Sequence, residues 1–474
     1  MTFDRAPATG PKRYASTDAK ARHGGRTGSH AIQPVERPFR VYTRRHLDEM
    51  PYVSELPERV RQGMKAVSAV LPFRVNEYVV RELIDWSNIP DDPIYRLTFP
   101  HPDMLEREDF ERMLEMVRRD APHDEVHVAA REIQERLNPH PGGQMELNVP
   151  VLEGEPQPGM QHKYRETVLC FPAAGQTCHA YCSYCFRWAQ FVGIEEYRFA
   201  ARQADGFYEY VRRHDEVRSV LFTGGDPLVM KTKVLRRYVE PFLDPGLEHL
   251  ESIRIGSKAL AYWPHRFLSG DDADDLLRLF EQVVASGRNL ALMAHFSHPR
   301  ELETRAVRQA IRRVRATGAV VRCQAPIVSN VNDSADVWAD MWTTQVRLGA
   351  IPYYMFVERD TGANRYFEVP LGRALAVFNE AYSRVSGLAR TVRGPSMSAK
   401  PGKVLVEGVE DVAGEKVFVL RFIQARDPSW VGRVFFARYD PEATWLRDLE
   451  PAFGRDEFFF RNTTGNAKAG RAAS

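Results

Sequence analysis

The spacing of hydrophobic positions changes partway along the chain. From about residue 44 to residue 140, apolar residues recur every three or four positions, as in VRQGMKAVSAVLPFRV and DFERMLEMVRRDA; this is the period of amphipathic helices. From about residue 164, short apolar runs alternate with helical stretches such as ADDLLRLFEQVVASG and ETRAVRQAIRRVRATG. The runs are TVLCFPA, SVLFTG, SIRIGS, LALMAHF, AVVRCQAPI and IPYYMFVE. The pattern predicts a helical N-terminal region followed by six strands that alternate with helices.

Strands that alternate with helices favour an α/β fold, in which parallel strands are joined by right-handed crossovers. Six repeats are fewer than the eight of a closed barrel, so we expect a partial, open barrel. In such sheets the active site lies at the carboxyl ends of the strands.

The segments on either side of this unit have a different composition. Residues 1–38 are rich in small and charged residues, which predicts a disordered arm. Beyond about residue 404, KVLVEGVEDVAGEKVFVLRF predicts a β-hairpin. We therefore divide the chain into an arm (1–38), a helical region (39–160), the α/β unit (161–390) and a C-terminal extension (391–474).

Composition and charge narrow the class of protein. The 474 residues are 43% hydrophobic and 27% charged, as in ordinary globular proteins. With 65 basic and 63 acidic residues the net charge is +2, so no global field favours nucleic acid or an anionic membrane. The sequence shows no apolar run long enough for a membrane span and no signal-peptide core, and five cysteines argue against a disulfide framework. We expect a cytoplasmic protein.

Three of the five cysteines, Cys178, Cys182 and Cys185, lie in the stretch CHAYCSYCF. A structural zinc site needs four ligands, usually in two pairs, and no second pair is present. A redox C-x-x-C pair needs a thioredoxin-like context and leaves Cys178 without a role. Three thiolates on one loop can instead bind three irons of a [4Fe–4S] cluster and leave the fourth iron open. The sequence favours the cluster, with zinc and an inert loop as alternatives.

Glycine or polar residues end the next four predicted strands. They are Gly224, Gly225 and Asp226 in LFTGGDPL, then Ser257, His295 and Gln324. Each alone is typical of a turn, a cap or a buried hydrogen bond. Because the carboxyl ends of parallel strands meet at one edge of the sheet, together they indicate a cofactor site.

The C-x3-C-x2-C loop, with the aromatic Tyr184 before its last cysteine, resembles the radical SAM family. The resemblance implies that the open iron binds S-adenosylmethionine, which is cleaved on one-electron reduction to a 5′-deoxyadenosyl radical. It also implies that the Gly-Gly-Asp motif, Ser257, His295 and Gln324 bind this cosubstrate. The external reductant would be flavodoxin or ferredoxin.

Further segments resemble one subfamily, the lysine 2,3-aminomutases, over residues 60 to 406. They are LPFRVNEYVVRELIDWSNIPDDPI, HFSHPRE, VSNVNDS and IPYYMF. The resemblance implies a partial (βα)6 radical SAM barrel, bound pyridoxal 5′-phosphate and a homo-oligomer. The reaction it implies moves an α-amino group to the β carbon, after the radical abstracts hydrogen from a pyridoxal external aldimine. The alternative is another radical outcome, such as a dehydrogenase, epimerase or deaminase, with or without pyridoxal phosphate.

The same resemblance suggests roles for individual residues. The pyridoxal lysine is Lys403 or Lys400 in GPSMSAKPGKVLVEG, and Lys403 is favoured because it follows Pro-Gly and precedes VLV. Tyr164 matches a tyrosine beside the cofactor ring. Arg187 matches an arginine that pairs with the substrate carboxylate, which a guanidinium binds in a bidentate manner.

The sequence departs from the family where lysine-specific members carry two substrate-binding aspartates. At the first position, in FVERDTGANRYF, Glu358, Arg359 and Asp360 compete, and we assign the two acids as candidate substrate contacts. At the second position stands Ser396. A buried ammonium group with only one carboxylate is poorly compensated, so this pattern argues against lysine. Arg359 or Arg365 fits an acidic side chain, and a neutral amino acid is the other option. The C-terminal zinc-binding cysteines of some members are missing, so we expect no zinc.

Overall fold

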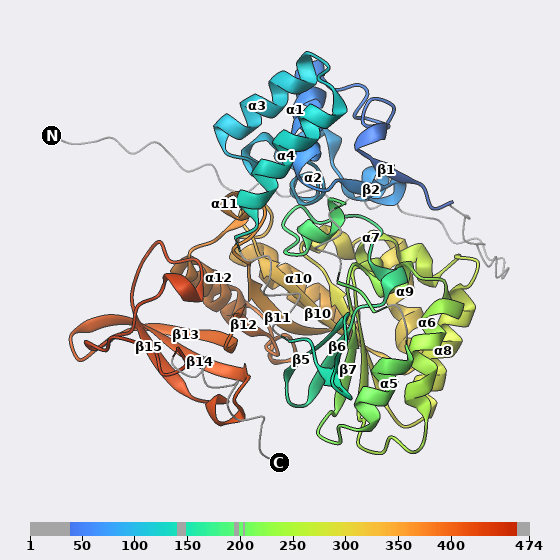
Figure 1. Ribbon diagram of the computed structural model, residues 1–474, viewed down its shortest axis with the longest axis vertical. Coiled ribbons are helices and arrows are strands. Elements are labelled where there is room, and N and C mark those ends of the chain that lie inside the picture. Colours follow the sequence, from blue (N-terminus) through green and yellow to red (C-terminus); the bar gives the residue numbers. More distant parts are fainter. Residues whose placement is uncertain (1–37, 140–147, 194–198, 202–203, 462–474) are drawn as a thin grey trace, which may run out of the picture. The chain divides into compact units, whose positions relative to one another are not determined.

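The computed structural model describes residues 38–139, 148–193, 199–201 and 204–461 (Figure 1). The predicted arm, except for its last residue, and the end of the C-terminal extension therefore lie outside the described residues. No helix in the described ranges has the length and apolar character needed to cross a membrane.

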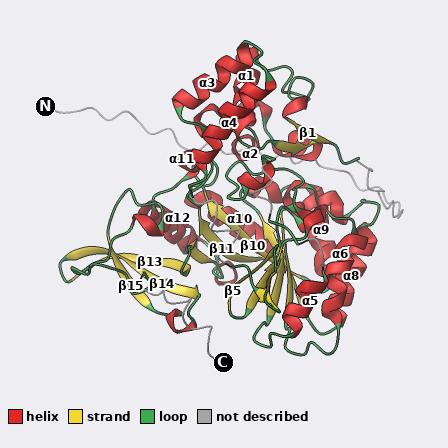
Figure 2. Cartoon of the chain, viewed as in Figure 1, coloured by secondary structure: helices red, strands yellow, loops and turns green. Residues whose placement is uncertain are grey.

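An eleven-stranded sheet forms the centre of the fold (Figure 2). Its strands, in order across the sheet, are β15 (Val434–Arg438), β14 (Glu415–Ala425), β13 (Gly402–Val412), β12 (Arg393–Ser398), β11 (Ile351–Val357), β10 (Val320–Ile327), β9 (Asn289–His295), β8 (Ser252–Ser257), β7 (Ser219–Phe222), β6 (Thr167–Cys170) and β5 (Met160–Tyr164). Strands β6 to β12 pair in parallel, and β5 and β13–β15 pair antiparallel to their neighbours. The six predicted strands are present as β6 to β11.

Helices connect the parallel strands in chain order. They are α5 (Asp205–Arg212), α6 (Thr232–Val239), α7 (Ala259–Tyr262), α8 (Ala273–Ala285), α9 (Arg305–Ala316), α10 (Ala335–Arg347), α11 (Asn364–Phe367) and α12 (Leu371–Arg384). Each parallel strand pairs with the next one along the chain, and right-handed crossovers in a constant direction place the connecting helices on the same face of the sheet. Helix α9 illustrates why these helices pack on the sheet, because one of its faces is apolar. Its buried residues, which recur at helical spacing, are Val307, Ala310, Ile311 and Val314.

The N-terminal region is helical, as predicted from its periodicity. It contains α1 (Glu58–Val70), α2 (Pro93–Thr98), α3 (Arg107–Arg118) and α4 (His123–Leu137), and β1 (Val41–Thr43) pairs with β2 (Arg74–Asn76). One hydrophobic core continues from Met64 and Val67 of α1 to Ile253 and Leu292 of the sheet. The N-terminal helices therefore share one hydrophobic core with the α/β unit.

The predicted C-terminal hairpin is confirmed as β13 and β14. Its turn lies between the paired residues Val412 and Glu415, and Ala413 and Gly414 both have positive φ, as the tight turns of hairpins require. The extension has a second core rich in aromatic residues, which includes Phe418, Phe422 and Phe435.

Candidate functional site

The cysteine loop after β6 is held in place by the N-terminal region. The backbone N–H of Tyr181 donates to the carbonyl of Arg74 at 2.8 Å, and that of Ser183 donates to Leu97 at 2.8 Å. The Arg74 side chain in turn donates from Nε to the carbonyl of Cys178 at 2.7 Å. The helical region therefore positions a loop that begins more than a hundred residues further along the chain.

The three cysteines of this loop are free thiols. Burial raises the pKa of all three, to about 12 for Cys185, and the Cys182 sulfur lies 3.4 Å from the Tyr262 hydroxyl. In the described ranges no three His, Cys, Asp or Glu side chains are placed to hold a metal ion. A [4Fe–4S] cluster does not need such a point of convergence, because each cysteine binds a different iron. The donor chemistry of the loop therefore fits a cluster, whose cationic irons would stabilise the thiolates.

The Gly-Gly-Asp motif after β7 packs against Gly175 and Thr177, which directly precede the cysteine loop. A Cβ on Gly225 would lie 2.4 Å from the carbonyl oxygen of Thr177, and Gly224 has a φ of +139°, so both positions favour glycine. The Asp226 backbone N–H donates to the carbonyls of Gly175 and Thr177 at 3.0 and 2.7 Å. These contacts join the end of β7 to the start of the cysteine loop.

The Asp226 carboxylate is occupied by its own chain. It accepts hydrogen bonds from the Ser257 hydroxyl at 3.0 Å and from the backbone N–H groups of Lys258 and Leu228, both at 2.9 Å. The side chain is only 2% exposed. In this structure Asp226 thus positions the end of β8 against the cysteine loop, and its predicted contact with S-adenosylmethionine stays a prediction.

Ser257 and His295 are the last residues of β8 and β9, where the sequence predicted them. Burial, together with the nearby Lys258, lowers the pKa of His295 to about 3, so this imidazole is neutral at physiological pH. Gln324 was expected to end its strand, and this placement is wrong, because β10 continues to Ile327 through an apolar run. Gln324 pairs with His295 across the two strands and lines an internal cavity.

A buried polar network that sequence reasoning missed lies beside the cysteine loop. Lys258 forms an ion pair with the fully buried Glu301 at 2.8 Å and donates to the Ser297 hydroxyl at 3.1 Å. The Tyr184 hydroxyl is 3.0 Å from the same Ser297 oxygen. The signal for this network was present in IGSK and HFSHPRE, where charged residues directly follow strand ends.

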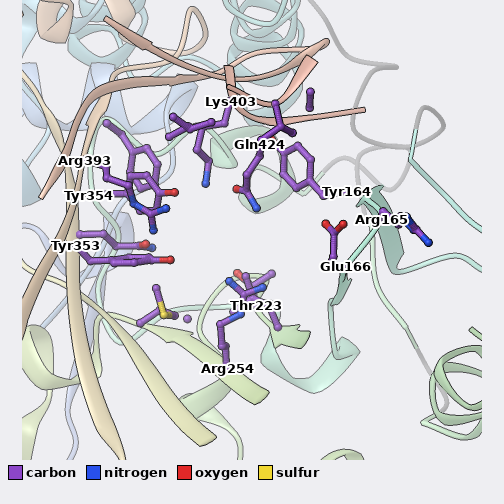
Figure 3. Close-up of a pocket in the computed structure, with 18 of the residues that line it drawn as sticks. Tyr164, Arg165, Glu166, Thr223, Arg254, Tyr353, Tyr354, Arg393, Lys403 and Gln424 are labelled. Atoms are coloured by element: carbon purple, nitrogen blue, oxygen red, sulfur yellow. The ribbon is translucent and has the colours of Figure 1, made fainter. Parts of the chain in front are cut away.

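An internal cavity of about 510 Å³ contains the favoured lysine (Figure 3). Three predicted residues line it, namely Lys403, Tyr164 and Gln324. Eight polar residues that the sequence analysis did not single out also line it: Arg165, Glu166, Thr223, Arg254, Tyr353, Tyr354, Arg393 and Gln424. Lys400, in contrast, is exposed. Of the two candidate lysines, Lys403 therefore lines the cavity and Lys400 does not.

Lys403 enters this cavity from the second position of strand β13. The preceding glycine is required, because a Cβ on Gly402 would lie 2.4 Å from the carbonyl oxygen of Gln424. The Lys403 amine lies 4.2 Å from the ring centroid of Tyr354. Burial, and then the charges of Arg393 and Arg254, lower the pKa of Lys403 to about 7. A large fraction of this amine is therefore neutral at physiological pH.

Two of the arginines that line the cavity have guanidinium groups suited to an anion, and one carboxylate, Glu166, also lines it. The Arg254 Nε is buried without a hydrogen-bond partner, and its Nη2 donates to the Thr167 hydroxyl at 3.3 Å. The Arg393 guanidinium lies 4.4 Å from the ring centroid of Tyr354. Among the residues described, neither arginine forms an ion pair with a carboxylate. A compact anion such as a phosphate group suits these guanidinium donors.

The candidate substrate residues lie at the end of β11 and after the cysteine loop. Arg187 is 8% exposed, and burial lowers its pKa to about 10. Burial also raises the pKa of Glu358 well above its usual value. Asp360 is paired with Arg447 of the C-terminal extension at 2.7 Å. Burial therefore favours the neutral form of Glu358, whereas the carboxylate of Asp360 already has a cationic partner.

Known proteins match this chain over most of its length. No family model matches it. A protein of Aquifex aeolicus (strain VF5) named "Putative L-lysine 2,3-aminomutase" is 31% identical over 405 residues, which cover 85% of this chain and 94% of that protein. The chain belongs to the L-lysine 2,3-aminomutase family of radical SAM isomerases. The L-lysine 2,3-aminomutase of Bacillus subtilis (strain 168) is 25% identical and covers 74% of this chain and 64% of its own length. A solved structure of Streptococcus suis SuiB bound to S-adenosylmethionine has a TM-score of 0.32 at 10% identity, covering 58% of this chain and 55% of that one.

In this member of the aminomutase family, cationic side chains link the cysteine loop to the lysine cavity. The charge of Arg359 lowers the pKa of both Arg187 and Lys163, and the charge of Lys403 also lowers that of Lys163. Each of these side chains is therefore close enough to the next for its charge to be felt. A row of cationic side chains thus runs between the cysteine loop and the cavity of Lys403.

Proposed function

We propose that this protein is a pyridoxal phosphate-dependent radical SAM 2,3-aminomutase, which converts an α-amino acid into a β-amino acid. The observation that carries the proposal is the Lys403 amine, whose pKa is about 7, in a cavity with two arginines and several tyrosines. A depressed pKa makes an amine nucleophilic at neutral pH, and the arginines supply the site for a phosphate. Membership of the aminomutase family supports the same conclusion.

We also infer that β6 to β11 form a partial (βα)6 barrel. In support, the strands are parallel and follow one another in chain order, and right-handed crossovers place their helices on one face. Leu221, Arg254 and Met293, from three successive strands, all line the cavity. The inner face of the sheet therefore encloses the proposed site.

Separate groups of residues would hold the proposed cofactors. The three cysteines would bind a [4Fe–4S] cluster, and the backbone of Gly224 and Gly225 with Ser257, His295 and Gln324 would bind S-adenosylmethionine. Lys403 and Tyr164 would hold pyridoxal phosphate, with Arg254 and Arg393 at its phosphate. When bound, the cluster and S-adenosylmethionine supply a radical that abstracts hydrogen, and the pyridoxal ring supplies a system that delocalises the unpaired electron.

The chain's own residues orient the substrate and protect the reaction. Lys403, which forms no ion pair among the described residues, would hold the cofactor through its neutral amine. Arg187 offers its guanidinium to the substrate carboxylate. The rings of Tyr164, Tyr353 and Tyr354 line the cavity and exclude water, which would otherwise compete with each of these contacts.

Anaerobic reconstitution tests the proposal. The protein is loaded with iron, sulfide and pyridoxal phosphate and then given S-adenosylmethionine, dithionite and a panel of amino acids. We expect a β-amino acid product that is absent in Cys182→Ala and Lys403→Ala and retained in Lys400→Ala. Accumulation of 5′-deoxyadenosine in stoichiometric amounts without a β-amino acid would favour a different radical outcome. Dithionite replaces the flavodoxin or ferredoxin that we propose as the partner; a homo-oligomeric state also stays a proposal.

A further inference from the structure

Two arginines, one from the cysteine loop and one from the end of β11, lie near the same aromatic ring. The guanidinium carbon of Arg187 is 5.6 Å from the ring centroid of Phe186, and that of Arg359 is 4.9 Å from it. By these distances the two guanidinium carbons are at most about 10.5 Å apart.

Neither guanidinium has its charge neutralised by an ion pair among the described residues. Arg187 donates only to the side-chain oxygen of Gln190, at 3.3 Å, and Arg359 donates to the backbone carbonyl of Ser398, at 3.1 Å. Asp360, which adjoins Arg359 in sequence, forms its ion pair with Arg447, although its charge also acts on Arg359. Two cations so close together, one buried and one half-buried, are costly unless anions compensate them.

The same region offers little to a substrate ammonium group. Ser396 is 0% exposed, and its hydroxyl has no hydrogen-bond partner. Ser398 pairs with Lys403 and Ser396 with Leu405, and alternate residues of a strand face the same side. The unpartnered Ser396 hydroxyl is thus on the face of the sheet that carries Lys403. It can donate a hydrogen bond to an oxygen, but it carries no charge to offset an ammonium.

The two pairs of arginines in this region lie in different places. Arg254 and Arg393 line the cavity of Lys403, whereas neither Arg187 nor Arg359 lines that cavity. Arg187 lies two residues after Cys185 in the sequence, and the proposed hydrogen abstraction takes place near the cluster. The substrate is therefore expected to contact Arg187 and Arg359.

From this arrangement we propose that the substrate is a dicarboxylic α-amino acid, with its α-carboxylate on Arg187 and its side-chain carboxylate on Arg359. The proposal rests on the aminomutase function proposed above. Two carboxylates would neutralise both guanidinium groups with charge-assisted hydrogen bonds, which are the strongest that side chains make. The Ser396 hydroxyl is placed to donate to such a ligand from the same face.

Glutamate and aspartate are the probes, with glutamine, leucine and lysine as comparisons. Binding is measured by calorimetry on the pyridoxal phosphate-loaded protein, and turnover by separation of α- and β-amino acids. We expect glutamate or aspartate to bind at least ten times more tightly than glutamine or lysine. Arg359→Gln should weaken dicarboxylate binding about 10- to 100-fold, the range for a hydrogen bond to a charged group, and leave leucine binding unchanged.

Matched variants keep the result interpretable. Arg359→Lys should recover part of the lost binding, because it restores the charge without the guanidinium geometry. Arg365→Gln is the control, since Arg365 is exposed and pairs with Glu106 at the surface. Production of β-lysine with an unaffected Arg359→Gln variant would overturn the dicarboxylate proposal and leave the aminomutase function intact. If no amino acid gives a β product but dicarboxylates still bind through Arg359, the aminomutase function fails and the ligand class stands.

Discussion

The lowered pKa of Lys403 leads to a prediction that can be tested without a bound cluster and without measuring turnover. An ordinary lysine is about 0.03% neutral at pH 7, whereas an amine with a pKa of about 7 is about half neutral. Unphosphorylated pyridoxal, trapped by borohydride, should therefore label Lys403 of the protein selectively near neutral pH. Because only the neutral amine reacts, the labelling rate should rise with pH and level off just above pH 7. Peptide mass mapping identifies the labelled lysine.

The charge of Arg393 is one cause of the lowered pKa of Lys403, and the size of its effect can be worked out from the structure. The Lys403 amine and the Arg393 guanidinium lie 4.2 and 4.4 Å from the ring centroid of Tyr354, so they are at most about 8.6 Å apart. At an effective dielectric constant near 20, two unit charges about 8 Å apart repel by about 2 kcal/mol. Removing Arg393 should therefore raise the pKa of Lys403 by about 1.5 units. Burial is the largest cause of the shift, so the pKa should not return to its ordinary value.

The assay compares wild type with Arg393→Gln across the pH range. At pH 7 the variant should be labelled about 15-fold more slowly, because its neutral fraction falls to about 3%. Pyridoxal without its phosphate is used so that a lost phosphate contact does not contribute. Arg438→Gln, on β15 and paired with surface acids, should change nothing. A wild-type midpoint near pH 10, an unchanged midpoint in Arg393→Gln, or labelling at Lys400 would refute the reasoning.

Stability should depend on pH through the same residue. Between about pH 7 and pH 10 the unfolded protein binds a proton on Lys403 that the folded protein does not, so the free energy of unfolding rises with pH in that window. Lys403→Met removes this penalty. In the absence of cofactor it should be more stable than wild type below pH 7, by up to about 5 kcal/mol, and the difference should vanish towards pH 10. Denaturant titrations at several pH values measure it, and a difference that is constant with pH would contradict the assignment.

Three further predictions concern the residues that position the cysteine loop. Asn76→Ala removes side-chain hydrogen bonds to the carbonyls of His179 and Tyr262, at 3.2 and 2.8 Å, and should lower the free energy of unfolding by about 2–4 kcal/mol, as measured in urea. Lys258→Met leaves the charge of Glu301 buried without its partner and should cost about 3–5 kcal/mol, most of which the double variant with Glu301→Leu should restore; a double variant as unstable as the single would contradict the ion-pair account. Gly225→Ala forces a methyl group against the backbone of Thr177, whereas Gly387→Ala meets nothing within 4 Å, so only the first should reduce the iron content after reconstitution.

Local patterns were enough to predict most elements of the central fold. Short apolar runs and a helical period of 3.6 residues predicted six of the seven parallel strands and the helices between them, because the buried side of each element must be apolar; strand β12 was not predicted. The cysteine loop and the Gly-Gly-Asp turn were found for a related reason, since all the groups of each motif lie within a few consecutive residues. Gln324 was misplaced because an apolar run does not reveal where a strand ends.

The tertiary structure alone decided how distant residues combine. Arg254, Arg393 and Tyr354 come from three different strands, and only the register of the sheet brings them around Lys403. The environment of Asp360 also depends on the tertiary structure, because Arg447 of the C-terminal extension forms an ion pair with it. The pKa of Lys403 also follows from the fold, because burial and neighbouring charge, neither of which is a property of local sequence, lower it. The sequence by itself thus determined which motifs the chain carries, and the packing of the sheet determined which charged side chains lie together around Lys403.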